Sequence, residues 1–325
     1  MHPVLAAPGT TTAESRSLNA GEVAAALDEH GYLADVGLAT VILLALHLRR
    51  PLLLEGDAGV GKTEVAKVLA RWTGGELLRL QCYEGIDIAQ AAYEWDHARQ
   101  LLHLRAVEAV ASVEHGARRT DDVPLTVGSL DAELYQDTFL IRRPLLRALE
   151  PTSGPPPVLL VDEIDRADDE FEAFLLEVLS DWSFTVPELG TITADVPPVV
   201  ILTSNRTRDL HDALKRRCLY HWVDHPDRVR EIAIVRRRVP AIDARLAAQV
   251  GAAVERLRTL GLAKPPGVAE TIDWAEALNA LGCGELDVVT ASATLGAVLK
   301  YREDHERVRG DVLAEVVAAA AEVGA

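Results

Sequence analysis

Residues 56–63 read Gly-Asp-Ala-Gly-Val-Gly-Lys-Thr, which matches the phosphate-binding loop G-x-x-x-x-G-K-[ST]. Glycines in such a loop let main-chain N–H groups converge on phosphate oxygens at the start of a helix. The lysine neutralises charge on the β- and γ-phosphates, and the hydroxyl that follows it is a magnesium ligand. The sequence therefore predicts a site for Mg²⁺ and a nucleoside triphosphate. The residues expected to contact the nucleotide here are Gly56, Asp57, Ala58, Gly59, Val60, Gly61, Lys62, Thr63 and Glu64.

A pair of adjacent carboxylates lies one hundred residues further on, where Asp162 and Glu163 follow the apolar run 158–161. An apolar run of this kind predicts a buried strand, and ligands of parallel sheets bind at the carboxyl ends of the strands. We expect Asp162 to hold Mg²⁺ with Thr63, directly or through water, and Glu163 to polarise the water that attacks the γ-phosphate. The neighbouring acids Asp165 and Asp168 are expected to lie at the surface or to cap a helix.

Two further signals follow in chain order. The run 199–203 ends next to Asn205, which would orient the attacking water beside the γ-phosphate, although an asparagine at a strand end is also an ordinary turn residue. Arg216 and Arg217 offer planar, permanently charged groups that suit an arginine finger reaching a neighbouring subunit's nucleotide. Arg217 is the first candidate and Arg216 the second, with an interface salt bridge as the alternative for both.

The elements that must position these side chains are strands alternating with helices, a pattern typical of a covered parallel sheet. Five apolar runs predict its strands, at 52–54, 76–82, 158–161, 199–203 and 219–223. The spacing within 169–180 predicts a helix with an apolar stripe, and places Glu172 and the other acids of that segment off the stripe.

Helical spacing also marks the chain before and after the strands. Residues 1–20 are expected to form a loose tail, 21–49 to be helical, and 226–325 to form a separate all-helical domain after an α/β domain at 21–225. Residues 107–157 carry a weak signal, apart from a proline-rich loop near 151–157.

The composition of the chain favours some classes of binding partner over others. The formal net charge of −17 disfavours general affinity for nucleic acid and favours protein partners, although 205–240 holds ten Arg or Lys and only five Asp or Glu. The three cysteines show no paired metal-ligand spacing, and no apolar run approaches the roughly 20 residues of a membrane span. We therefore expect a cytoplasmic protein with no membrane partner.

At these residues the chain resembles the MoxR family of AAA+ ATPases, and most of all its CoxD-like members. The phosphate loop and the acidic pair are typical of the wider superfamily, whereas the segments 80–85, 92–96 and 270–274 resemble the narrower group. The resemblance implies an AAA+ core, a parallel five-stranded sheet between helices, with a C-terminal helical lid. It also implies a homo-oligomer, a hexameric ring, with ATP and Mg²⁺ at the subunit junctions.

Further implications of the resemblance concern partners and details of the site. MoxR-type ATPases typically act with a von Willebrand A-domain protein as chaperones that mature metalloenzymes, and for the CoxD-like branch the client would be molybdenum-copper carbon monoxide dehydrogenase. Tyr32 and Leu33 match the adenine-holding segment, and 85–105 and 183–198 match inserts where Tyr83, Tyr93 and Trp95 would contact a client or simply pack in the core. Residues 266–270 lack the lid arginine that many members carry, so either another lid arginine replaces it or the lid closes more weakly.

Two other functions fit the same motifs. One is a nucleic-acid-directed AAA+ motor of the restriction type, using ATP or GTP, which hydrolysis stimulated by duplex DNA would favour. The other is a nucleotide-gated scaffold that binds ATP without needing to hydrolyse it.

Overall fold

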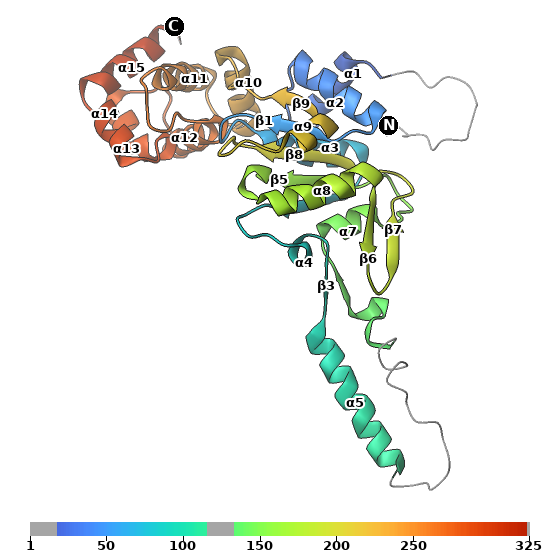
Figure 1. The fold of residues 1–325 in the computed structure, drawn as a ribbon. Coiled ribbons are helices and arrows are strands. Elements are labelled where there is room, and N and C mark those ends of the chain that lie inside the picture. Colours follow the sequence, from blue (N-terminus) through green and yellow to red (C-terminus); the bar gives the residue numbers. More distant parts are fainter. Residues whose placement is uncertain (1–17, 116–132, 324–325) are drawn as a thin grey trace.

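The structure is a computed structural model that describes residues 18–115 and 133–323. Most of the tail expected at 1–20 lies outside the described residues. The helical segment expected at 21–49 consists of two helices, α1 (Ala20–Glu29) and α2 (Val36–Leu48), rather than one. The chain between them carries Tyr32 and Leu33. Both helices pack into the core on one face of the central sheet (Figure 1).

The central sheet has five parallel strands in the order β2-β5-β8-β1-β9. This confirms the five strands that the apolar runs predict. Because all five run in the same direction, their carboxyl ends meet along one edge, where the phosphate loop, the acidic pair and Asn205 follow in turn. The strands are β1 (Leu52–Glu55), β2 (Leu77–Gln81), β5 (Val158–Asp162), β8 (Val199–Ser204) and β9 (Leu219–Trp222).

Helices cover both faces of the sheet, as the near-continuous apolar strands require. One face packs on α1, α2 and α3 (Lys62–Thr73), with Leu52, Leu160 and Ile201 in the shared core. The opposite face packs on α7 (Pro144–Leu149), α8 (Asp169–Asp181) and α9 (Asp212–Arg217). The side chains alternate along each strand, so that neighbouring residues lie in different cores.

Two inserts interrupt the alternation of strands and helices. In the first, α4 (Ile88–Ala91) leads into β3 (Tyr93–Trp95), which pairs antiparallel with β4 (Leu140–Arg142). Between them lie η1 (Asp137–Phe139) and α5 (His97–His115), and α5 projects away from the body (Figure 1). The second insert is the antiparallel hairpin of β6 (Ser183–Val186) and β7 (Gly190–Thr193).

The aromatic residues of the first insert differ in exposure. Trp95 is buried with Phe139 and Leu140, and Tyr93 is partly buried against it and against Phe184 of the hairpin. Tyr83 is exposed. Of these three, only the Tyr83 side chain lies largely open to contact by another protein.

The chain after β9 is helical throughout its regular elements and has a core of its own around the fully buried Trp274. The division into 21–225 and 226–325 stays a proposal. No described helix is long and apolar enough to cross a membrane. These helices are α10 (Arg228–Arg238), α11 (Ala244–Arg258), α12 (Val268–Ala280), α13 (Val288–Val298), α14 (Arg302–Val308) and α15 (Asp311–Val323).

One expectation about acids is wrong, and a second acid, expected off the apolar stripe of its helix, is nevertheless buried. Asp165, in the short helix η2 (Ile164–Arg166), is buried rather than at the surface, and accepts hydrogen bonds from the Thr207 N–H and hydroxyl at 2.8 Å each. Glu172 is buried on α8 and pairs with Arg208. Each carboxylate accepts its hydrogen bonds from residues distant in sequence, which offsets part of the cost of its burial. Asp168, by contrast, caps α8 as expected.

Candidate nucleotide site

The turn between β1 and α3 owes its shape to glycines. A Cβ on Gly56 would lie 2.3 Å from the carbonyl oxygen of Val223, so only glycine allows this close approach to β9. Gly61, at φ +96°, is the N-cap residue immediately before α3. The amphipathic α3 is held in place because Val65, Val68, Leu69 and Trp72 are buried, as their spacing predicts.

Lys62 is buried and its ammonium group donates three hydrogen bonds. The acceptors are the carbonyl oxygens of Gly56 and Asp57, at 2.7 Å each, and Oδ1 of Asn205 at 2.8 Å. Burial lowers the pKa of Lys62, while the nearby acids Asp165, Asp57, Asp162 and Glu163 oppose that change. The three bonds place a cation inside the loop and join it to the end of β8.

The acidic pair is held by hydroxyl groups from two other elements. Oδ1 of Asp162 accepts from the hydroxyl of Thr63 at 3.0 Å and from that of Thr203 at 2.6 Å. The same Thr203 oxygen accepts the main-chain N–H of Glu163 at 2.9 Å. Glu163 has a left-handed backbone, with φ of 56°, and such non-glycine conformations cluster at functional sites.

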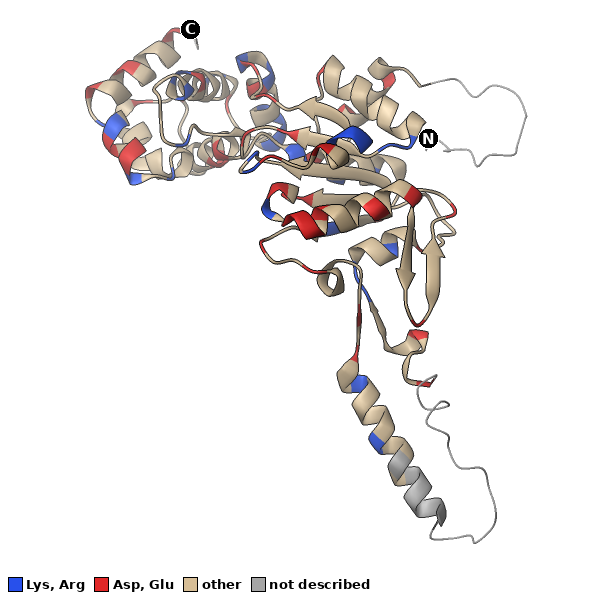
Figure 2. Ribbon diagram, viewed as in Figure 1, with Lys and Arg blue, Asp and Glu red and all other residues tan. Residues whose placement is uncertain are grey.

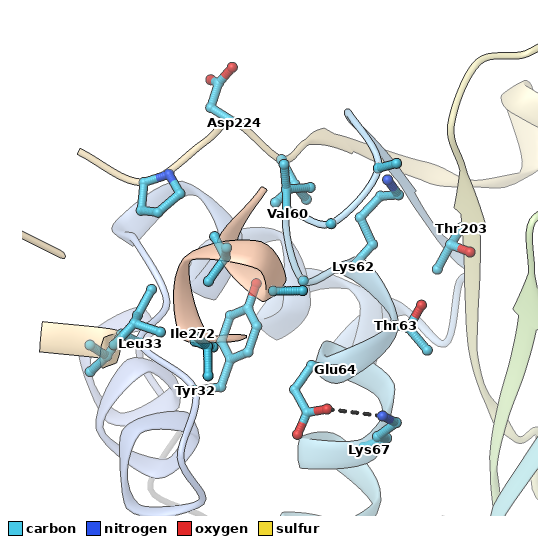
Figure 3. A pocket seen from close by; sticks show the side chains of 18 of the residues that line it. Tyr32, Leu33, Val60, Lys62, Thr63, Glu64, Lys67, Thr203, Asp224 and Ile272 are labelled. Carbon is cyan, nitrogen blue, oxygen red and sulfur yellow. Dashed lines mark hydrogen bonds and ion pairs between the residues drawn. The ribbon is translucent and has the colours of Figure 1, made fainter. Parts of the chain in front are cut away.

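These side chains border a pocket of about 370 Å³ between the sheet and the helical region (Figure 3). Of the residues predicted to bind or act on the nucleotide, all line it except Gly56, Asp57, Arg216 and Arg217. Gly56 packs against the main chain of Val223, and the Asp57 carboxylate lies 3.4 Å from Nε2 of His225. The lining residues among the predictions are Tyr32, Leu33, Ala58, Gly59, Val60, Gly61, Lys62, Thr63, Glu64, Asp162, Glu163 and Asn205.

The end of the pocket away from the acidic pair is apolar. Figure 3 shows Tyr32 and Leu33, from the break between α1 and α2, near Val60 of the loop and Ile272 of α12. Desolvation by burial raises the pKa of Tyr32 to about 12, so its hydroxyl is neutral at physiological pH. An apolar end beside a glycine turn and a lysine suits a flat base attached to phosphates.

Arg216 and Arg217 are exposed at the end of α9, outside the pocket. The guanidinium of Arg50 donates to the carbonyl oxygens of Arg216 at 2.7 Å and of Arg217 and Cys218 at 3.2 Å each, which anchors the end of this short helix. The structure therefore places neither arginine at the nucleotide pocket of its own chain.

The helical region touches the phosphate loop through the main chain. The N–H of Val268, the first residue of α12, donates to the carbonyl oxygen of Gly59 at 3.0 Å. The lid positions 267–270 carry no arginine, but Arg230 and Arg238 of α10 line the pocket. Arg230 is already bonded to the Leu33 carbonyl at 2.9 Å and paired with Asp35 at 3.1 Å. Arg238 forms a long ion pair with Glu64, at 4.0 Å.

The donor set beside the loop fits magnesium. Thr63 and Asp162 supply a hydroxyl and a carboxylate within hydrogen-bond distance of each other, and Mg²⁺ prefers oxygen ligands completed by water and substrate phosphates. Within the described residues no group of three or more His, Cys, Asp or Glu is arranged to hold a metal by itself. The site would therefore hold Mg²⁺ through Thr63, Asp162 and the phosphates together.

Sequence reasoning missed several residues of this site. Thr203 was placed on a strand but given no role, and Arg79 and Gln81 of β2, which contact the acidic pair, were not singled out. Polar residues alternating with buried Leu78 and Leu80 at the end of a strand were the available signal, because period-two alternation marks one face. Arg230 and Arg238 lie in the basic stretch 205–240, and Ile272 lies in the segment 270–274, but neither pattern predicts a place in this pocket.

Comparison with known proteins places this geometry in a family. A family model described as "AAA domain (dynein-related subfamily)" matches residues 51–218, just over half of the chain. The chain belongs to this AAA family. Members bind nucleotide with Mg²⁺ and typically form oligomers. The matched segment of this AAA protein runs from just before β1 to the end of α9.

Solved structures with a similar arrangement include two variants of RuvB from Thermotoga maritima. One has 14% sequence identity and a TM-score of 0.42 over 85% of this chain and 68% of that chain. The other has 14% identity and a TM-score of 0.45 over 88% and 72%. At this identity the likeness concerns the fold alone.

Proposed function

We propose that this AAA protein hydrolyses Mg-ATP in the pocket and uses the cycle to remodel a partner protein, as a ring-forming chaperone. The observation that carries the hydrolytic part is the set of hydrogen bonds that joins the loop to the carboxyl ends of β8 and β5. Lys62 bonds Asn205, and Thr63 bonds Asp162. Three chain segments thus supply a phosphate-binding cation, a metal ligand and a candidate water-polarising carboxylate around one volume.

Each residue would have a defined task in that reaction. Lys62 and the main-chain N–H groups of the loop bind the phosphates, and bound Mg²⁺ would draw charge from the β- and γ-phosphates. Glu163 accepts a proton from the attacking water, and Asn205 orients that water. Since Lys62 already bonds the Asn205 oxygen at 2.8 Å, the same contact fixes the amide relative to the γ-phosphate position.

An arginine from a neighbouring copy would complete the site. Charge develops on the phosphoryl oxygens in the transition state, and the described cations of this pocket come from its loop, from α3 and from α10. Arg217, or else Arg216, is exposed and anchored through Arg50, and would reach the pocket of the next subunit in a ring.

The metalloenzyme client and the von Willebrand A-domain partner are proposed from the resemblance to MoxR and CoxD-like proteins. The acidic charge of −17 supports a protein partner over nucleic acid. The exposed Leu101 and Leu102 of the projecting α5 support contact with a protein away from the nucleotide.

Two variants test the proposal. In Lys62→Ala the phosphates lose their buried cation, and calorimetry should show ATP binding abolished; unchanged affinity would contradict the assignment. In Glu163→Gln the side chain keeps its size but cannot accept the proton, so binding should persist while ATP turnover falls by roughly 10²-fold or more. The same hydrolysis assay is repeated with competing GTP and with added duplex DNA. Preferred use of GTP, or hydrolysis stimulated by the duplex, would favour the nucleic-acid-directed motor. Client maturation that survives complete loss of hydrolysis in Glu163→Gln would favour the scaffold.

A further inference from the structure

Strand β2 lies at the edge of the sheet and runs parallel to β5, with Gln81 opposite Asp162. Leu78 and Leu80 point into the core on one face, so Arg79 and Gln81 point to the opposite face, toward α3 and the acidic pair. The Arg79 side chain is 53% exposed, whereas that of Asp162 is 4% exposed. The half-exposed Arg79 therefore reaches the buried Asp162 from the edge of the sheet.

The guanidinium of Arg79 occupies the second oxygen of Asp162. Its Nη2 and Nε donate to Oδ2 at 2.6 and 3.0 Å, while Oδ1 accepts the hydroxyls of Thr63 and Thr203. Nη2 also donates to the Gln81 amide oxygen at 2.5 Å. Both oxygens of the predicted metal ligand thus have donors, and a positive charge lies directly on one of them.

We propose that Arg79 is a positioning residue that sets the Mg²⁺ affinity of the site, by holding Oδ2 of Asp162 and opposing the second cation with its charge. This inference rests on the proposed Mg-nucleotide function. Two consequences of the contact act in the same direction. A metal or its water that approaches Asp162 competes with the guanidinium for Oδ2, and the fixed positive charge repels the dication.

The orientation of Asp162 does not depend on Arg79 alone. The two threonine hydroxyls on Oδ1 come from α3 and β8, and neither hydrogen bond involves Arg79. Removing the guanidinium should therefore leave the ligand in place, free its second oxygen and remove a repulsive charge. Because Arg79 is half exposed, solvent and salt screen its charge, and the effect is moderate, about threefold to tenfold in Mg²⁺ affinity.

The test measures Mg²⁺ binding rather than turnover. A fluorescent ADP analogue is titrated with full-length protein at a series of free Mg²⁺ concentrations, and the Mg²⁺ midpoint of nucleotide affinity is recorded. Arg79→Gln should lower this midpoint about threefold to tenfold, and more at low salt than at high salt. Arg79→Lys keeps the charge but not the two-nitrogen contact, so its midpoint should lie between those of wild type and Arg79→Gln.

Arg147→Gln is the matched control, because Arg147 is also half exposed and paired with a carboxylate, that of Glu76, but does not contact the acidic pair. Its midpoint should equal that of wild type. A midpoint that is unchanged or raised in Arg79→Gln would overturn the inference, as would an Arg79→Lys protein that behaves like Arg79→Gln. If Arg79→Gln does not fold, Arg79→Met is measured in the same way. Wild-type protein that fails to bind the ADP analogue at any Mg²⁺ concentration would instead refute the proposed function.

Discussion

Replacing Thr203 by valine removes one hydroxyl that holds both members of the acidic pair. Thr203 is 1% exposed, donates to Asp162 at 2.6 Å and accepts the Glu163 N–H at 2.9 Å. Valine has nearly the same shape, so the change opens no cavity and isolates the loss of two hydrogen bonds. A hydrogen bond to a charged group is worth about 1.5–3 kcal/mol, and a buried N–H left without a partner costs about 1–3 kcal/mol.

Since the two contributions share one atom and are not fully additive, we expect Thr203→Val to lower the free energy of unfolding by about 2–4 kcal/mol. Urea unfolding, followed at two protein concentrations to account for self-association, measures this loss. Thr185→Val is the control: its hydroxyl bonds only the exposed Thr191 across the hairpin, so its effect should stay within about 0.5 kcal/mol. A Thr203→Val protein as stable as that control would refute the reasoning that this hydroxyl organises the acids.

Two more predictions concern the subunit junction and pH. Arg217→Ala should keep nucleotide binding but lose turnover, and mixing it with Glu163→Gln subunits should restore part of the rate; mixed rings without recovery would argue against action across a junction. Burial, followed by the charge of Arg258, lowers the pKa of His225, so the unfolded chain takes up this proton more readily than the folded chain. The stability that His225 contributes is therefore present above about pH 6.5 and is lost as pH falls through the lowered folded value, and His225→Gln should flatten that acid-side loss in thermal melts measured from pH 7.5 to 5. An equally steep loss in the variant would show that another group controls it.

Local sequence was sufficient to predict the fold class and the neighbourhood of the site. The three central strands β5, β8 and β1 were visible because each is a nearly unbroken apolar run covered on both faces, and β2 and β9 were visible as shorter, mixed runs. The glycine loop was visible because its spacing is a backbone requirement rather than a packing preference. Their common edge follows from topology, since parallel strands end on the same side. That is why Lys62, Asp162 and Asn205, far apart in the sequence, line one pocket.

The residues that sequence reasoning missed depend on which strand lies next to which. Arg79 contacts Asp162 only because β2 is the neighbour of β5, and no pattern within 77–81 reveals that pairing. The contribution of α10 to the pocket likewise depends on how the helical region packs against the loop. Figure 2 shows that α10 is rich in basic residues. From the sequence alone such a helix is interpreted as a solvent-exposed surface, and only its packing reveals its place beside the pocket.

The two buried acids Asp165 and Glu172 show how the loop after β8 is fixed. Asp165 accepts the main-chain N–H groups of Asn205 at 3.2 Å and of Thr207 at 2.8 Å, and Glu172 accepts that of His211 at 2.8 Å while pairing with Arg208. Two buried carboxylates from the segment after β5 therefore hold the start and the end of residues 205–211. A buried carboxylate without partners would be very costly, so these contacts stabilise the two acids as well as the loop. This explains how a loop of seven residues holds the Asn205 amide 2.8 Å from Lys62, and why an acid-rich stretch that resembles a surface is instead the support of the site.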